Sequence, residues 1–163
     1  MSSVSTPFLA PLPHSNRNTV FTALFNYMQL IAPPTGQQWK SFSQFLRHWN
    51  EVNTQDQPAM FLHRGPQTAS QTSAFGVTKW RWTATIWIYY RTDSYRTNNH
   101  YPDEVTDPLI DSIEQLFQTD PLTGRLTLGG LVHHCYIDGT IFADSGMTDD
   151  PQAVILIPIT ILL

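Results

Sequence analysis

His133, His134 and Cys135 are three adjacent residues of the types that bind transition metals. Neighbouring side chains on a strand point to opposite faces of a sheet, so the two histidines could not hold the same ion. His133 and Cys135 could share a face, but a zinc site needs further ligands. Asp138 would fall on the face of His134 rather than with them. We therefore expect structural roles for these side chains and no bound metal.

Two pairs of adjacent carboxylates, at 103–104 and 149–150, could in principle serve acid–base chemistry. Both pairs fall in expected loops near a proline, and the sequence places no nucleophile or base beside them. The double glycine at 129–130 lacks the lysine and the following helix of a phosphate-binding loop. No Gly-x-Ser-x-Gly elbow and no His-Glu-x-x-His motif occurs. We expect neither an enzyme nor a cofactor.

The chain has five tryptophans and six tyrosines, a composition that also suits sugar-binding proteins. Strict alternation predicts a strand over 79–90, and three of the tryptophans fall within it. Trp80 and Trp82 share its more apolar face and are expected in the core. Trp87 and Tyr89 share the other face, where they could stack on a sugar or pack against another subunit. We favour the subunit, because aromatic residues are enriched at protein interfaces.

Two helices are expected, one before and one after this strand in the sequence. The first runs over 19–31, with a cap at Asn16 or Asn18 and an end enforced by the prolines at 33–34. The second begins with Asp107 as its cap and Pro108 in its first position. Each has one apolar stripe at helical spacing. The stripes are Val20, Phe21, Leu24, Phe25, Met28 and Ile31, and Leu109, Ile110, Ile113, Leu116 and Phe117.

The remaining segments complete an α+β domain with a mainly antiparallel sheet flanked by two helices. Strands are expected over 58–63, over 126–141 with a bend at the double glycine, and over 153–162. Residues 41–52 could form a strand or a short helix. Polar connections are expected at 64–77 and 91–107, with Asp138 and Gly139 in a turn or bulge.

The last expected strand is apolar on both faces, which predicts burial on both sides. Pro158 interrupts it, and a proline within a sheet is confined to an edge or a bulge. We therefore expect one free side, to be covered by a loop, by the proline itself or by a neighbouring subunit.

The composition describes a mildly acidic chain of 163 residues with a net charge of −4 and few charged residues, 13% of the total. This balance provides no basic field for nucleic acid. One cysteine suits a reducing cytoplasm. We expect no signal peptide and no membrane segment. We divide the chain into one domain over 16–163 and a Ser/Pro-rich arm over 1–15, either a disordered tail or an arm that lies on a neighbouring subunit.

The ordered set of segments resembles the tail terminator, or tail completion, family of long-tailed bacteriophages. The likeness covers roughly residues 20–163 and rests on order and spacing. It is carried by the first apolar helix, 47–52 (RHWNEV), 57–62 (QPAMFL), the strand ending in IYY at 88–90, the second helix, 127–134 (TLGGLVHH), the Asp-Gly pair at 138–139 and the apolar final strand.

The resemblance implies a structural virion protein without catalysis or cofactor. Six copies would form a ring on the tail tube, stop its polymerisation and offer a surface to the head-side connector, after assembly in the host cytoplasm. The alternatives are another neck or tail tube component, or a carbohydrate-binding module. The expected interaction residues are Arg47, Arg64, Lys79, Trp87 and Tyr89. Arg64 and Lys79 flank the polar connection at 64–77 and could meet acidic partner groups.

Overall fold

The structure is a computed structural model that describes residues 16–34, 37–70, 78–92, 103–144 and 152–163. Two helices and a six-stranded, mostly antiparallel mixed sheet make up the fold, which confirms the predicted α+β class. The elements are α1 (Arg17–Met28), β1 (Ser41–Ser43), η1 (Trp49–Glu51), η2 (Thr54–Asp56), β2 (Ala59–Ser70), β3 (Lys79–Arg91), α3 (Asp103–Leu116), β4 (His134–Ile137), β5 (Phe142–Asp144) and β6 (Gln152–Leu162).

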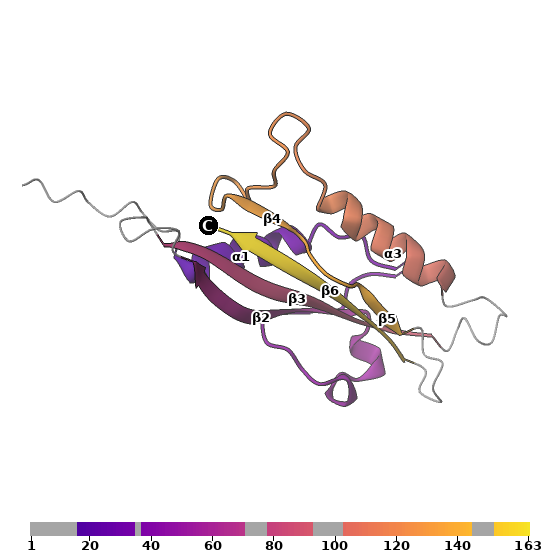
Figure 1. Cartoon of the computed structure of the whole chain (residues 1–163). Coiled ribbons are helices and arrows are strands. Elements are labelled where there is room, and N and C mark those ends of the chain that lie inside the picture. Colours follow the sequence, from indigo (N-terminus) through magenta and orange to yellow (C-terminus); the bar gives the residue numbers. More distant parts are fainter. Residues whose placement is uncertain (1–15, 35–36, 71–77, 93–102, 145–151) are drawn as a thin grey trace, which may run out of the picture.

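The sheet has the order β1-β2-β3-β6-β4, and β5 also pairs with β6 (Figure 1). The short strand β1 runs parallel to β2, whereas the other pairings are antiparallel. β6 therefore lies between β3 on one side and β4 and β5 on the other. The expectation that this strand has one free side is wrong. Pro158 instead lies opposite the gap between the end of β4 and the start of β5.

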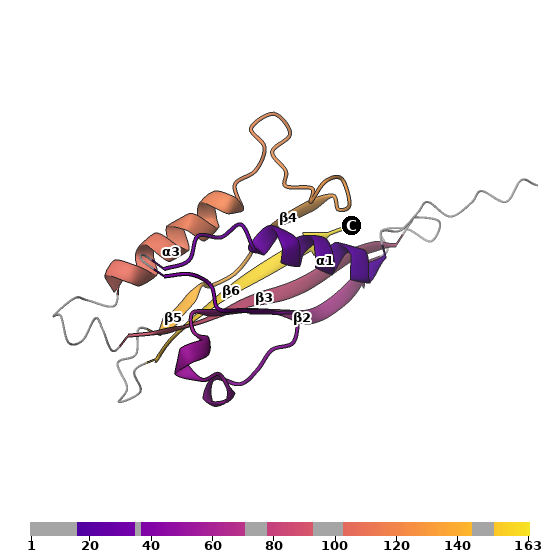
Figure 2. The ribbon, with the colours of Figure 1, turned by 180° about the vertical axis from the view of Figure 1, so that it is seen from behind.

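Both helices cover the same face of the sheet, as the view from behind shows (Figure 2). The alternating side chains of β3 and β6 that were expected in the core are buried there against α1 and α3, except Trp80, which is only partly buried. The sheet contributes Met60, Leu62, Trp82, Ala84, Ile86, Ile88, Tyr90, Cys135, Ala153, Ile155, Ile157, Ile159 and Ile161 to this core. In the described residues, no helix is long and apolar enough to cross a membrane.

α1 follows its prediction closely. The side chain of Asn16 accepts a hydrogen bond from the backbone N–H of Asn18 at 2.9 Å, so the helix is capped and begins at Arg17. Its buried residues are Val20, Phe21, Leu24 and Met28. The helix ends at Met28, a turn earlier than expected, although Ile31 remains buried beyond it.

α3 begins at Asp103, four residues before the expected cap at Asp107, so Pro108 lies inside the helix. The reason is tertiary packing. Val105 is buried and stands four residues before Leu109, so the apolar stripe starts one turn ahead of the proline. Burial of that extra turn offsets the hydrogen bond that the proline cannot make.

Two expected boundaries in the strands are wrong. β2 continues to Ser70, through the first half of the expected loop at 64–77, because its polar residues pair with β3 across a register shift between Arg64 and Gln67. Residues 71–77 lie outside the described part. In the expected strand at 126–141, Leu128 and the double glycine have positive φ angles of 49°, 74° and 86°. Such backbone cannot continue a strand, so 128–133 form turns and bends and β4 begins at His134.

The ambiguous segment at 41–52 contains both alternatives. Ser41–Ser43 form the edge strand β1, and Trp49–Glu51 form the short helix η1. His48 and Glu51 cap η1 reciprocally, each side chain bonding to the backbone of the other.

Candidate functional site

The face of the sheet turned away from the helices is the first candidate surface, and we call it the open face. Across its middle, Leu156 of β6 lies between Trp87 of β3 and Phe142 of β5, its direct partners in the two ladders. Directly opposed residues of an antiparallel pair share a face. Phe142 is 52% exposed, and the other two are partly exposed. This row is therefore an apolar strip on the surface of the described chain.

One end of the open face is covered by the segment 44–58. Val52 of that segment packs in a small second core with Ala59, Phe61 and Tyr89. The hydroxyl of Tyr89 donates to the backbone oxygen of Arg47 at 3.2 Å. Burial raises the pKa of Tyr89 to about 12. Tyr89 is thus a core residue of the chain, and it cannot join Trp87 in stacking on a sugar.

The other end of the open face is polar. Arg81 forms an ion pair with Asp138. Thr160 donates its hydroxyl to the same carboxylate at 3.0 Å, although Thr160 itself is buried. The carboxylate joins β3 and β6 to the bend after β4. This cluster has a structural partner for each of its charges and holds the sheet rather than a ligand.

The structure divides the five expected interaction residues among separate places. The Arg47 guanidinium lies 5.7 Å from the ring centre of Phe61, at the covered end of the open face, near Trp87 and Tyr89. The Arg64 guanidinium lies 4.6 Å from the ring of Phe21, on the helix side of β2. Lys79 is exposed at the start of β3, beside a hollow of about 260 Å³.

Trp87 carries a further feature that the sequence did not indicate. Its indole Nε1 is buried and has no hydrogen-bond partner among the described residues. A buried donor without an acceptor costs free energy. Trp87 is therefore a partly exposed side chain whose indole N–H is left unsatisfied.

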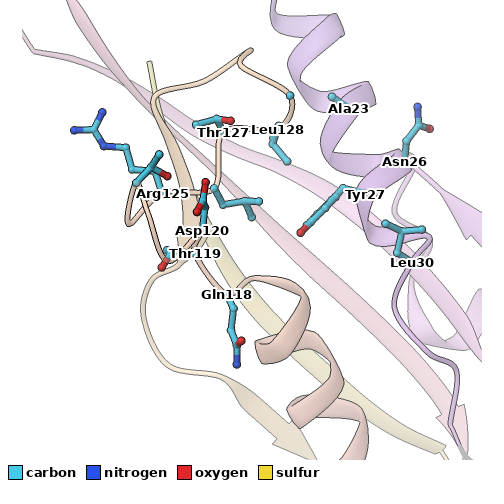
Figure 3. A pocket seen from close by; sticks show the side chains of 13 residues that line it. Ala23, Asn26, Tyr27, Leu30, Gln118, Thr119, Asp120, Arg125, Thr127 and Leu128 are labelled. Atoms are coloured by element: carbon cyan, nitrogen blue, oxygen red, sulfur yellow. The ribbon is translucent and has the colours of Figure 1, made fainter.

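A second candidate surface is a hollow of about 670 Å³ between α1 and the turns that follow α3 (Figure 3). Tyr27 lines it from α1, Leu30 from the turn directly after that helix, and Leu126 and Leu128 from the turns after α3. Leu30 is 68% exposed and lies two residues beyond the end of α1. No sequence pattern predicted this hollow, and its one visible signal was an apolar leucine outside the expected stripe of the first helix.

Tyr27 fixes one wall of the hollow. Its hydroxyl donates to the backbone oxygen of Leu116, at the end of α3, at 2.6 Å. Burial, with a smaller contribution from Cys135, raises the pKa of Tyr27. The phenol therefore stays neutral and ties α1 to α3.

His133 and Cys135 do not form a metal site in the structure. Cys135 points into the core and is fully buried, and burial raises the pKa of its thiol to about 12. His133 is exposed, and the His134 ring accepts a hydrogen bond from the backbone N–H of Leu126. In the parts of the chain that are described, no three metal-binding side chains come together.

Comparison with known proteins adds no relative. No protein-family model and no curated protein matches this sequence.

Proposed function

We propose that this protein is a structural subunit of a long-tailed bacteriophage, which forms a six-membered ring on the tail tube, stops its polymerisation and meets the head-side connector. Its place would be the neck of the virion, after assembly in the host cytoplasm. It would require neither a cofactor nor a metal.

The observation that carries the proposal is the apolar row of Trp87, Leu156 and Phe142 on the open face. Adjoining apolar side chains at a solvated surface mark a candidate interaction site, and aromatic side chains are enriched at protein interfaces. The row is flanked by the covered core at one end and the Arg81–Asp138 pair at the other. It therefore has an apolar centre and a polar margin on one side, features that protein interfaces share.

A ring also needs two different surfaces on each subunit, because a head-to-tail contact joins unlike patches. The open face and the hollow beside α1 are two such surfaces, on opposite sides of the sheet. The low charge of the chain, 13% of residues, supports the same proposal, since like-charged subunits repel one another.

The test is the mass of the native assembly. Native mass spectrometry of the full chain should give six copies, and negative-stain images should show rings. Phe142→Asp should convert the ring to subunits, because a charge would be buried in the apolar row. Phe45→Asp is the matched control, since Phe45 is 77% exposed and lies off the row. Its ring should persist.

The capping step is tested separately with purified tail tube protein. Addition of the ring-forming chain should end tube growth, whereas the Phe142→Asp variant should not. A strict monomer at high concentration, with or without tubes, would contradict the proposal. So would tubes that keep growing in the presence of rings.

A further inference from the structure

We propose that the hollow between α1 and the turns after α3 binds the proline-rich segment 7–13 of a second copy of this chain. The inference deepens the proposed function by naming a contact between neighbouring subunits, and it rests on that proposal for the presence of a neighbour.

The hollow has an apolar floor. Ala23 of α1 and Leu30, just beyond that helix, face Leu128 from the turns, with the Tyr27 ring between them (Figure 3). Arg125 reaches away from α1 in the same view, and the Asp120 carboxylate, which also lines the hollow, is bonded to the N–H of Leu122. The apolar part of the hollow favours an apolar occupant, because a charge placed against it would lose its hydration.

The walls of the hollow are held in place before anything binds. The backbone N–H of Gly124 donates to the backbone oxygen of Asp120 at 2.7 Å. The backbone N–H of Asp120 donates to the backbone oxygen of Arg125 at 3.2 Å. The Asp120 carboxylate accepts the N–H of Leu122 at 2.8 Å. Little ordering is then left to be done on binding, which favours affinity. The volume of about 670 Å³ suits a short peptide segment.

The arm supplies the matching chemistry. Residues 1–15 contain no Lys, Arg, Asp or Glu, and residues 7–13 read PFLAPLP. Their three prolines favour an extended polyproline conformation, which loses little entropy on binding and is recognised by grooves that contain aromatic side chains. Phe8, Leu9 and Leu12 provide the apolar side chains that the floor can cover. A charged or glycine-rich arm would not fit this site.

The geometry of α1 favours the hollow of a neighbour over the chain's own. The arm joins α1 at Asn16, whereas the hollow lies beside the second half of the same helix and the turn after it, from Ala23 to Leu30. To reach it, the chain would have to reverse beside its own helix cap. Prolines 7, 11 and 13 stiffen the segment against such a reversal. From Asn16 back to Pro7, an extended arm can span about 30 Å, enough to reach an adjacent subunit.

The experiment uses the full chain in two co-expressed forms with different affinity tags. In one form, the photoreactive analogue p-benzoylphenylalanine stands at position 8. We expect light to give a product of twice the 18.6 kDa chain mass that contains both tags. Peptide mapping should place the attachment within residues 23–30 or 118–129 of the other form. A product of single-chain mass, or attachment to the open face, would overturn the inference.

Matched variants test the site itself. Leu30→Asp adds a charge to the apolar floor at a position that is 68% exposed, so it should spare folding while lowering the cross-link yield at least tenfold. Phe45→Asp, at a position that is 77% exposed and away from the hollow, should leave the yield unchanged. An unchanged yield in Leu30→Asp would overturn the inference.

Native mass separates this inference from the proposed function. Six-copy rings without a cross-link into the hollow would overturn only the arm contact. Cross-linked pairs from a chain that never forms rings would overturn only the proposed function and support the arm contact.

Discussion

Asp138 donates its backbone N–H to the carbonyl oxygen of Pro158, 3.0 Å away. In an antiparallel strand, the N–H and the carbonyl of one residue point to the same neighbour, so the missing N–H of the proline also faces this side. Here the pairing is interrupted, because the four residues 138–141 stand opposite only two residues of β6. The bulge displaces the facing carbonyl, which would otherwise lie opposite the proline and have no N–H donor. A proline thus fits the centre of the sheet, and β4 and β5 are two strands rather than one.

Gly139 is the residue that makes this bulge possible. Its φ is +121°, and an added Cβ would lie 3.2 Å from Cγ of Pro158. We predict that Gly139→Asn lowers the free energy of unfolding by about 1–3 kcal/mol, as expected for a strained backbone. Urea denaturation measures the change. The control is Gly124→Asn, where φ is +65° and no atom lies within 4 Å. Asparagine tolerates that conformation, so equal losses in both variants would contradict the strain argument.

Ile161 and Leu162 are neighbours on β6 with opposite environments. Ile161 is fully buried in the core, whereas Leu162 is partly exposed on the open face. Ile161→Ser should cost about 2–5 kcal/mol, because it leaves a cavity and a buried hydroxyl. Leu162→Ser should cost clearly less. Deletion of 159–163 should yield an unfolded or insoluble chain. A soluble deletion variant with unchanged melting would show that the central strand is dispensable.

Stability should fall at alkaline pH. The pKa of Cys135 is raised from 9.0 to about 12, so the unfolded chain loses this proton at a lower pH than the folded chain does. The stabilisation is complete below about pH 9 and is lost as the pH rises to about 12. Each pKa unit is worth about 1.4 kcal/mol, so the loss is about 4 kcal/mol at most. Tyr89 adds to it above pH 10.

Urea denaturation from pH 8 to pH 11 checks this expectation. In the Cys135→Val variant the decline should be shallower, because the contribution of the buried thiol is removed. A decline of the same steepness in both proteins would assign the effect to other groups.

Purified protein should contain no stoichiometric zinc by elemental analysis. His133 is exposed, whereas Cys135 is buried in the core, so they face different surroundings. Replacing them together, as His133→Leu and Cys135→Val, should leave the assembly mass unchanged. Stoichiometric zinc that disappears in this double variant would refute the expectation.

The sequence predicted best where one element determines its own pattern. The alternation of β3 and β6 and the stripe of α1 are local, and the structure buries the expected faces. β2 was predicted too short, because residues 64–70 are polar and join the sheet only through pairing with β3. The start of α3 was missed, because the burial of Val105 outweighs the usual role of a proline.

The candidate surfaces were harder to foresee. The hollow joins α1 to turns about 90 residues further along the chain, and no local pattern reports such a contact. The row on the open face needs the register of three strands, and Phe142 enters it only through the bulge. Trp87 was expected at a surface, but Tyr89 was expected with it and is covered by the segment 44–58.

The place of β6 also bears on how the protein is made. Its pairing partners β3, β4 and β5 all leave the ribosome before it, and β3 and β4 stay apart in the sheet until β6 arrives between them. The contacts that close the sheet are therefore long-range and late, which is typical of slow-folding topologies. A polypeptide interrupted during translation would expose the apolar flanks of two half-sheets and become a substrate for proteases. Synthesis of β6 is thus the step that allows the two half-sheets to join.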